Sequence, residues 1–383
     1  MLAIFIVVAL ILSPVFLFNP QNFRVNISQY LQSKQEQNQV LSLWHIETFE
    51  GGSTSRSAYL QKIATEFNKQ NNGVFIIIKT LTMEQARLNV KEGCCDIVSF
   101  GFGAGELLKP YLVSLQEVKL EKDFDMVAKN NDNVLAYPYM YGGYATITRE
   151  QAMISSGFTP ENLQENLFNI FISKKNNKAV GFAKKSQTNF AKALSLCSVF
   201  GNPTNFFDNN LDTYQTYCKF IEGEFSTLVG TTRDVVRCKN REMAGKLSSC
   251  VYNYLSGYTD LVQCIGVMNG EEVKQKTAME FATFLLSEYS QTQIKKVGMF
   301  STTGKVLYDD GYMKDFEQAM LKEKQVPNIF MTETDIEKEK AECFAKVCVW
   351  NLENLKSSCN KMVLFILKMK RWKITHLSKL VEK

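Results

Sequence analysis

Histidine is nearly absent from this 383-residue chain, which contains only His45 and His376. A Ser-His or Cys-His catalytic dyad outside the C-terminal tail could therefore use only His45. The ten cysteines form no Cys-x-x-Cys pair, whereas zinc sites usually take their ligands from such paired motifs. The sequence therefore disfavours a metal site and a histidine-dependent active site, and we expect no cofactor.

Nucleotide-binding and hydrolase signatures are also missing. The chain has no G-x-x-x-x-G-K-[ST] loop and no G-x-S-x-G elbow. Gly101, Gly103 and Gly105 are followed by Glu106, so they do not complete a dinucleotide-binding G-x-G-x-x-G motif. A glycoside hydrolase that uses two distant carboxylates has no fixed spacing, so this alternative stays open.

Excess positive charge is confined to the C-terminal end. Residues 337–383 contain eleven Lys or Arg against five Glu, a net charge of +6, while the whole chain carries +5. The remaining residues are therefore near −1, which argues against a nucleic-acid-binding body. We expect residues 346–383 to be a basic helical tail.

A hydrophobic run opens the chain. Residues 2–18 are apolar apart from Ser13 and Pro14, a length at the short end for a membrane span and long enough for a signal sequence. Residues 1–20 are therefore predicted to be a signal sequence or an N-terminal membrane anchor, and residues 21–39 a polar stalk. Both readings place the body at the extracellular face of the cell membrane.

The first part of the body predicts a parallel sheet. Apolar runs at residues 40–44, 74–79 and 96–99 read as strands, with helical periodicity between them. This strand–helix alternation is typical of an α/β protein. In the helices, apolar residues recur at helical spacing, as in Leu60, Ile63, Ala64 and Phe67 and in Ala278, Phe281, Ala282 and Leu285.

A glycine-rich loop follows the third of these strands. Ser99, Phe100, Gly101 and Gly103 lie where the strand ends and a helix is expected to begin. Such a loop presents backbone N–H groups at the carboxyl edge of a sheet, where small molecules bind in open α/β folds. We therefore predict that this loop is the floor of a ligand site.

Together, five stretches resemble the bacterial extracellular solute-binding proteins of ABC transporters, in particular the carbohydrate-type group. The resemblance extends over about residues 40–345, and the most specific stretch is a helix ending in Leu-Leu-Ser, then a Gln, then a Gly-x-Phe turn. The stretches are LWHIETFEGGSTSR (43–56), DIVSFGFGAG (96–105), LAYPYMYGGYATITRE (135–150), GTTRDVVR (230–237) and AMEFATFLLSEYSQTQIKKVGMFSTTG (278–304).

The resemblance implies an α/β fold with the two-lobed architecture of periplasmic binding proteins (type 2), a multi-segment hinge and a ligand cleft between the lobes. The N-terminal lobe would comprise residues 40–143 and 262–304, and the C-terminal lobe residues 144–261 and 305–345. Candidate crossings between the lobes are residues 142–146, 260–268 and 301–308.

The resemblance also implies a role. The protein would bind a carbohydrate, close about its hinge and deliver the ligand to the permease of an ABC importer. Lipid-anchored members carry a cysteine after the signal, whereas the first cysteine here is Cys94. The N-terminal segment itself is therefore expected to attach the protein to the membrane. A membrane-attached ligand sensor or scaffold with the same fold is the main alternative.

Sugars are bound by aromatic faces and converging hydrogen-bonding groups. Trp44 is equally compatible with a core position, and Arg233 and Asp234 could simply pair with each other. The cysteines at 218, 238, 250 and 264 could form disulfides or be small buried side chains. The candidate ligand-binding residues are Trp44, His45, Glu50, Ser99, Phe100, Gly101, Gly103, Tyr139, Tyr141, Tyr144, Arg233, Asp234, Tyr258 and Asp260.

Overall fold

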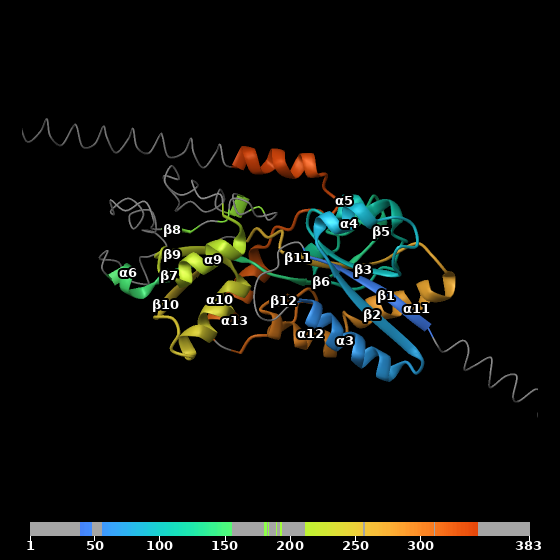
Figure 1. The fold of residues 1–383 in the computed structure, drawn as a ribbon, viewed down its shortest axis with the longest axis horizontal. Coiled ribbons are helices and arrows are strands. Elements are labelled where there is room, and N and C mark those ends of the chain that lie inside the picture. Colours follow the sequence, from blue (N-terminus) through green and yellow to red (C-terminus); the bar gives the residue numbers. More distant parts are fainter. Residues whose placement is uncertain are drawn as a thin grey trace, which may run out of the picture.

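The computed structural model describes two lobes, each built on its own β-sheet (Figure 1). The described residues are 39–47, 56–154, 180–181, 183, 189, 192–193, 211–255, 257–309 and 311–343. The hydrophobic N-terminal run, Glu50 and the tail beyond 343 lie outside them. Within the described residues, no helix is long and apolar enough to cross a membrane.

The larger sheet has six strands in the order β12-β6-β11-β3-β1-β2. Strand β1 runs parallel to its neighbours β2 and β3, as the alternating pattern predicted, and β11 runs antiparallel to both β3 and β6. The strands are β1 (Gln39–Ile46), β2 (Val74–Leu81), β3 (Ile97–Gly101), β6 (Tyr137–Tyr141), β11 (Val262–Val267) and β12 (Phe300–Ser301).

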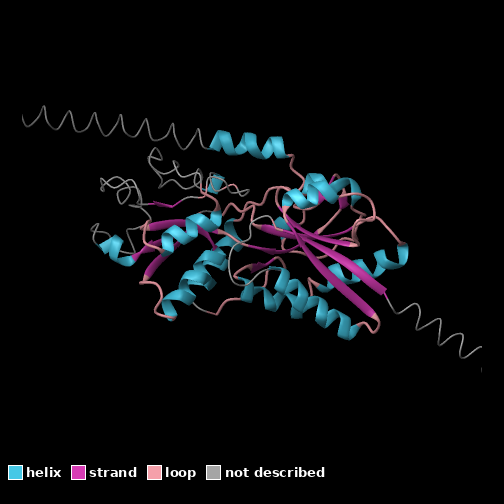
Figure 2. Ribbon diagram, viewed as in Figure 1, coloured by secondary structure: helices cyan, strands magenta, loops and turns pink. Residues whose placement is uncertain are grey.

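Helices α3 (Arg56–Gln70) and α11 (Glu272–Phe284) pack against the larger sheet (Figure 2). Their predicted apolar stripes are buried, and the rings of Phe67 and Phe281 meet edge to face at 5.3 Å between centroids. Both helical predictions are therefore confirmed. The other helical segments of this lobe are α4 (Met83–Asn89), α5 (Gly105–Leu108), η1 (Lys109–Tyr111), η2 (Lys122–Phe124), α12 (Glu288–Gln293) and η3 (Ile294–Val297).

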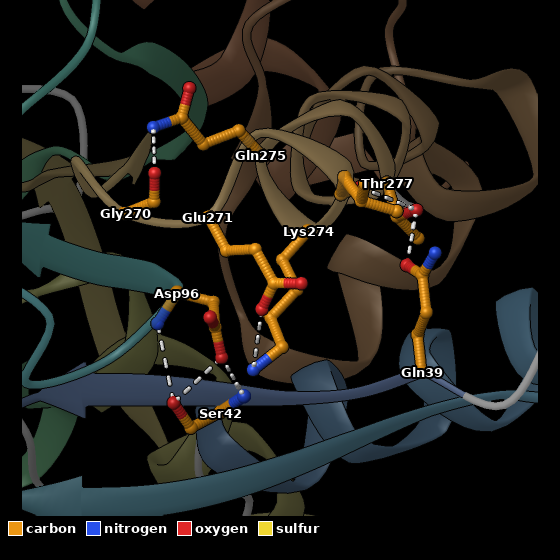
Figure 3. A network of polar contacts seen from close by, with 9 residues as sticks. Gln39, Ser42, Asp96, Gly270, Glu271, Lys274, Gln275 and Thr277 are labelled. Atoms are coloured by element: carbon orange, nitrogen blue, oxygen red, sulfur yellow. Dashed lines mark hydrogen bonds and ion pairs between the residues drawn. The ribbon is translucent and has the colours of Figure 1, made fainter. Parts of the chain in front are cut away.

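Polar contacts fix β1 between its neighbours. The Asp96 carboxylate, just before β3, accepts hydrogen bonds from the Ser42 N–H at 2.7 Å and the Ser42 hydroxyl at 3.0 Å (Figure 3). Thr277 of α11 donates to the Gln39 side chain at 2.7 Å. These contacts hold the start of β3 and the helix layer in register with β1. A two-stranded ribbon, β4 (Lys129–Asn130) and β5 (Asn133–Val134), also precedes β6.

The smaller sheet has four strands in the order β10-β7-β9-β8. Its strands are β7 (Tyr144–Arg149), β8 (Val180–Gly181), β9 (Thr227–Thr231) and β10 (Cys250–Tyr254), and its helices are α6 (Glu150–Ile154), α9 (Thr213–Ile221), α10 (Thr232–Met243) and α13 (Gly311–Glu323). Aromatic contacts tie α13 to this lobe, including Tyr254 against Phe316 at 5.9 Å between ring centroids.

Three described segments that join the two lobes come before α13 in the chain. Gly142 and Gly143 join β6 to β7, residues 255–261 join β10 to β11, and residues 302–310 join β12 to α13. The first two crossings lie side by side, because the Gly142 N–H donates to the Leu261 carbonyl at 2.8 Å and the Thr259 hydroxyl donates to the Gly142 carbonyl at 2.7 Å. Residues 262–267, where the sequence predicts a strand, form β11 in the larger sheet, so the candidate crossing at 260–268 is shorter than expected. The exact lobe bounds remain a prediction.

A last described helix, residues 333–343, spans from one lobe to the other. Glu333 forms an ion pair with Arg87 of α4 at 2.8 Å, and Glu339 forms one with Lys192 in the smaller lobe. Within the described part of the chain, the seven cysteines are free, and Cys238, Cys250 and Cys264 are buried. Buried thiols, rather than disulfides, are therefore what the structure has at these positions.

Candidate functional site

Three of the predicted residues meet at the edge of the larger sheet. His45 is the last residue but one of β1, Ser99 lies in β3 and Tyr139 lies in β6, so three different strands supply them. The His45 Nδ1 atom is 3.1 Å from the Ser99 hydroxyl oxygen, which is 2.9 Å from the Tyr139 hydroxyl. All three side chains are fully buried. We call this group, with Gln263 and Arg56 described next, the edge network.

Sequence reasoning missed two members of the edge network. Gln263 of β11 donates from Nε2 to the Ser99 hydroxyl at 3.0 Å, and Arg56 donates to the Gln263 side-chain oxygen at 2.7 Å. Both are fully buried. Gln263 carried a usable signal, since a lone amide within an otherwise apolar strand must find a partner when buried. Arg56, at the start of an amphipathic helix, read as an ordinary exposed residue.

The side chains of the edge network are buried, so any of their polar atoms that lacked a hydrogen-bond partner would destabilise the protein. A buried polar side chain without a partner costs about 1–3 kcal/mol, so the hydrogen bonds within this network also fix side-chain orientation. The Tyr139 ring stacks on Tyr59 at 6.1 Å between centroids, and Gln291 donates to the Tyr139 carbonyl at 2.9 Å. This Gln is the one that follows Leu-Leu-Ser in the most specific stretch of the resemblance.

The glycine-rich loop is packed rather than open along most of its length. Phe100 is fully buried, with its ring centroid 6.4 Å from that of Phe330, and Gly101 pairs with Gln263. A Cβ atom on Gly105 would be 2.0 Å from the Ile329 carbonyl oxygen, so this residue must be glycine. Gly103 has a φ of 91° and no heavy atom within 4 Å of an added Cβ. Residues 329–330 therefore cover the loop at its α5 end.

Trp44 lies within β1, beside the edge network. Only 7% of its surface is exposed, and the Lys79 ammonium of β2 is 5.9 Å from its ring centroid. Ile46, two residues further along β1, is fully buried. Trp44 therefore packs largely as a core residue in this structure, and its predicted contact with a ligand remains a prediction.

Tyr144 and Asp260 form a second buried pair, at the crossings. The Tyr144 hydroxyl donates to one Asp260 carboxylate oxygen, and the Asn189 N–H donates to the other at 2.5 Å. Burial raises the pKa of Asp260, while these hydrogen bonds act in the opposite direction. Tyr258 is buried nearby in the same chain segment, with the Lys192 ammonium 5.2 Å from its ring centroid, and burial raises its pKa.

Tyr141 lies in an aromatic cluster at the end of β6. Its ring centroid is 4.8 Å from that of Phe124 and 5.5 Å from that of Phe300, and the side chain is fully buried. Burial, together with the nearby Glu317 carboxylate, raises the pKa of its hydroxyl. No described residue hydrogen-bonds this hydroxyl. Tyr141 thus brings a polar atom to the hinge but not to the edge network.

The third crossing is held by Glu317 of α13. Its Oε2 atom accepts hydrogen bonds from the Leu307 N–H at 2.7 Å and the Tyr308 N–H at 3.2 Å. The side chain is 1% exposed, and burial raises its pKa to about 7 although the backbone donors favour the charged form. A carboxylate that titrates near neutral pH therefore anchors one of the connections between the lobes.

From the sequence, Arg233 and Asp234 could have formed an ion pair with each other. In the structure, the Asp234 carboxylate contacts other groups. Asp234 caps α10 by accepting from the Thr231 N–H at 2.9 Å, and it forms an ion pair with Arg237 at 2.8 Å. Arg233 is buried at the same helix start, where the Gly298 backbone approaches it closely. Asp234 therefore has a structural role, and ligand binding by either residue remains a prediction.

Two surface hollows lie away from the edge network. One, of about 200 Å³, is formed by residues of 117–138 in the larger lobe, and the other, of about 730 Å³, lies between α9 and α10. The second is lined by Tyr214, Tyr217, Arg237 and Arg241 among others. Neither includes a predicted ligand-binding residue. Among the residues that the structure describes, no group of three or more His, Cys, Asp or Glu is arranged to hold a metal ion.

Comparison with known proteins gives a match in fold. No protein-family model and no curated protein matches the sequence. A chitin oligosaccharide binding protein superposes with a TM-score of 0.58 at 10% identity, over 82% of this chain and 95% of that one. The GacH receptor of Streptomyces glaucescens, solved unliganded and with acarbose, gives a TM-score of 0.56 at 12% identity, over 82% of this chain and 93% of that one.

A third solved structure covers slightly more of the chain. It is an ABC substrate-binding protein from Listeria monocytogenes in complex with cycloalternan, with a TM-score of 0.53 at 12% identity, over 85% of this chain and 98% of the other. At this identity the likeness shows the fold. The predicted two-lobed α/β architecture of periplasmic binding proteins is therefore confirmed.

Proposed function

We propose that the protein is an extracellular solute-binding protein that binds a carbohydrate between its lobes and delivers it to an ABC importer. The observation that carries the proposal is the fold, which matches solved oligosaccharide-binding proteins over more than four-fifths of the chain. In this fold class a ligand is held by both lobes, and hinge closure encloses it. The chemistry required is binding without conversion of the ligand.

The edge network supports the same proposal. Its strands end at the edge of the larger sheet nearest the crossings, and Ser99, His45 and Tyr139 supply neutral donors and acceptors there. These side chains are fully buried and bonded to one another, so they support the sheet edge from below. We infer that the edge network sets the backbone that forms the ligand-facing rim, and that Trp44, the tyrosines and residues 230–234 contribute from the two sides.

Membrane attachment completes the proposal. The apolar run at residues 2–18 would export the body and either hold it at the extracellular face of the membrane or be removed. An anchored binding protein would keep its loaded form close to the permease. Two measurements on cells that express the full chain test this step. Protease added to intact cells should degrade the exported protein, and fractionation should show whether it stays with the membrane.

Calorimetric titration of the full-length protein tests the ligand assignment. We expect binding heat with at least one of acarbose, cycloalternan or chitin oligosaccharides, and none with an unrelated tripeptide. Trp44→Leu should weaken binding by about 1–3 kcal/mol if the ring stacks on a sugar, by analogy with base stacking. The matched control is Tyr289→Leu, a partly exposed aromatic of α12 outside the predicted set. Heat with the peptide alone would overturn the sugar assignment.

A further inference from the structure

Two consecutive thiols occupy the turn between α4 and β3. Gly93 adopts a φ of 71°, the Cys94 N–H donates to the Lys91 carbonyl at 3.2 Å, and the two sulfur atoms of Cys94 and Cys95 are 4.0 Å apart. This distance is within the range of an S–H···S hydrogen bond. The turn therefore directs both side chains of the pair to the same side.

The surroundings of the two thiols differ. Cys94 is partly exposed beside the exposed residues 91–93, whereas Cys95 is only 4% exposed. The hydrogen bond between the two thiols lowers the pKa of Cys94 to about 6, despite partial burial. The same hydrogen bond, together with burial and the charge of Asp96, raises the pKa of Cys95. One thiol is thus accessible and ionised near neutral pH, and its neighbour is protonated and shielded.

We propose that Cys94 and Cys95 form a redox-active dithiol that undergoes exchange with low-molecular-weight disulfides. The Cys94 thiolate attacks one sulfur of the incoming disulfide, and the other sulfur leaves as a thiolate that takes up a proton. Cys95 then loses its proton and attacks the Cys94 sulfur, which releases the second thiol. The protein dithiol is oxidised by two electrons to a disulfide, and the external disulfide is reduced to two thiols.

Geometry makes this exchange reversible. Consecutive Cα atoms are about 3.8 Å apart across a trans peptide, shorter than the roughly 4.4–6.8 Å that ordinary disulfides span. A bond between Cys94 and Cys95 is therefore strained, and strained disulfides are more readily reduced than structural ones. The site is consequently a labile modification point. It rests on the local geometry and is independent of the proposed transport role.

The dithiol lies next to a contact that positions the edge network. Asp96, the residue after Cys95, binds the Ser42 backbone and hydroxyl, and so joins the start of β3 to β1 (Figure 3). Those two strands carry Ser99 and His45. Formation of the strained ring would therefore pull on the β1–β3 contact.

Peptide mass analysis tests the proposal in the full chain. The reduced protein is treated with glutathione disulfide at neutral pH, quenched with acid, alkylated and digested with trypsin. Residues 92–119 contain only these two cysteines, and Lys109 precedes Pro110, so the fragment stays whole. We expect this fragment to lose two hydrogens and to regain them with dithiothreitol. Recovery of two alkylated thiols after treatment would overturn the proposal.

Two variants separate the roles of the thiols. Cys95→Ser should accumulate one glutathione on Cys94, because the second step is blocked, while Cys94→Ser should react at least about tenfold more slowly, because the thiolate is the nucleophile. Cys218, a partly exposed free thiol of α9, is the internal control. The circular dichroism of both variants should match that of the wild type. Equal rates of glutathione addition at Cys94 and Cys218 in Cys95→Ser would then contradict the proposal.

Discussion

The edge network and the hinge contain different kinds of buried polar group. At the edge, a serine, a tyrosine, a histidine and a glutamine share hydrogen bonds, with one guanidinium at the end of the chain of contacts. At the hinge, Asp260 and Glu317 are carboxylates buried among backbone and hydroxyl donors. Burial opposes ionisation, so pH should act on the hinge carboxylates and the crossings they hold.

The hinge should also be the more costly region to disrupt. Asp260→Ala removes the acceptor of both the Tyr144 hydroxyl and the Asn189 N–H, so that two buried donors each lose this hydrogen bond. We expect a loss of about 3 kcal/mol in the free energy of unfolding. Urea titration at neutral pH measures it. Tyr144→Phe, which removes one donor and keeps the ring, should cost about 1 kcal/mol, and equal losses in both variants would contradict this role for Asp260.

Protonation of Glu317 should make stability depend on pH. Its folded pKa of about 7 lies above the ordinary value of 4.5, so its contribution is complete below the unfolded pKa and is lost as pH rises through about 7. Relative to Glu317→Gln, the wild type should lose up to about 2–3 kcal/mol of unfolding free energy between about pH 4.5 and 8. Chemical denaturation of both proteins across this range measures the difference.

The other charged groups that act on Tyr141 beside Glu317 are the same in both proteins of that comparison. The Lys324 ammonium is fully buried and forms ion pairs with Glu121 and with Asp123, the latter at 3.1 Å, while Tyr141 packs from β6. Their titration cancels in the difference between wild type and variant. A difference that stays constant with pH would mean that Glu317 does not titrate near neutrality.

Within the edge network, Ser99 should matter more than any one of its partners. Its hydroxyl contacts His45, Tyr139 and Gln263, so Ser99→Ala leaves three buried groups with one contact fewer. We expect a loss of about 2 kcal/mol, and oligosaccharide affinity should also fall if the network sets the rim of the site. Thermal unfolding and calorimetric titration on the same samples measure the two effects. Unchanged affinity with reduced stability would give Ser99 a purely structural role.

The smallest expected effect is that of Tyr139→Phe. The ring keeps its stacking on Tyr59, and only the hydroxyl that meets Ser99 is removed. A loss of about 1 kcal/mol is expected, since Ser99 retains other partners. A double-mutant cycle with Ser99→Ala isolates the interaction between the two hydroxyls. Additive losses would show that the edge network is not cooperative.

Periodicity and strand order predicted the fold because they follow from which residues must be buried. The stripes in α3 and α11 and the apolar runs of β1, β2 and β3 were readable for that reason. Glycine pairs and tyrosines also marked the first crossing. The strand expected at residues 261–268 is confirmed as β11, but the candidate crossing at 260–268 overlapped it, because a strand and a hinge segment have the same apolar composition.

The site was less predictable from the sequence. His45, Ser99 and Tyr139 were named as candidates, but Gln263 and Arg56 join them only through strand order and helix placement. Gln263 is 164 residues from Ser99 in the sequence, and Arg56 is 207 residues from Gln263. Asp234 illustrates the opposite case, since its position three residues after Thr231 is a capping pattern that explains it without a ligand. Long-range polar pairing is therefore what sequence patterns specified least.

Backbone hydrogen exchange with and without a saturating oligosaccharide tests the central claim that one ligand contacts both lobes. We expect exchange to slow together in residues 99–105 of the larger lobe and in residues 230–234 of the smaller lobe, with further protection at the Gly142–Gly143 crossing. Protection confined to one lobe, with no change at the crossings, would contradict binding between the lobes.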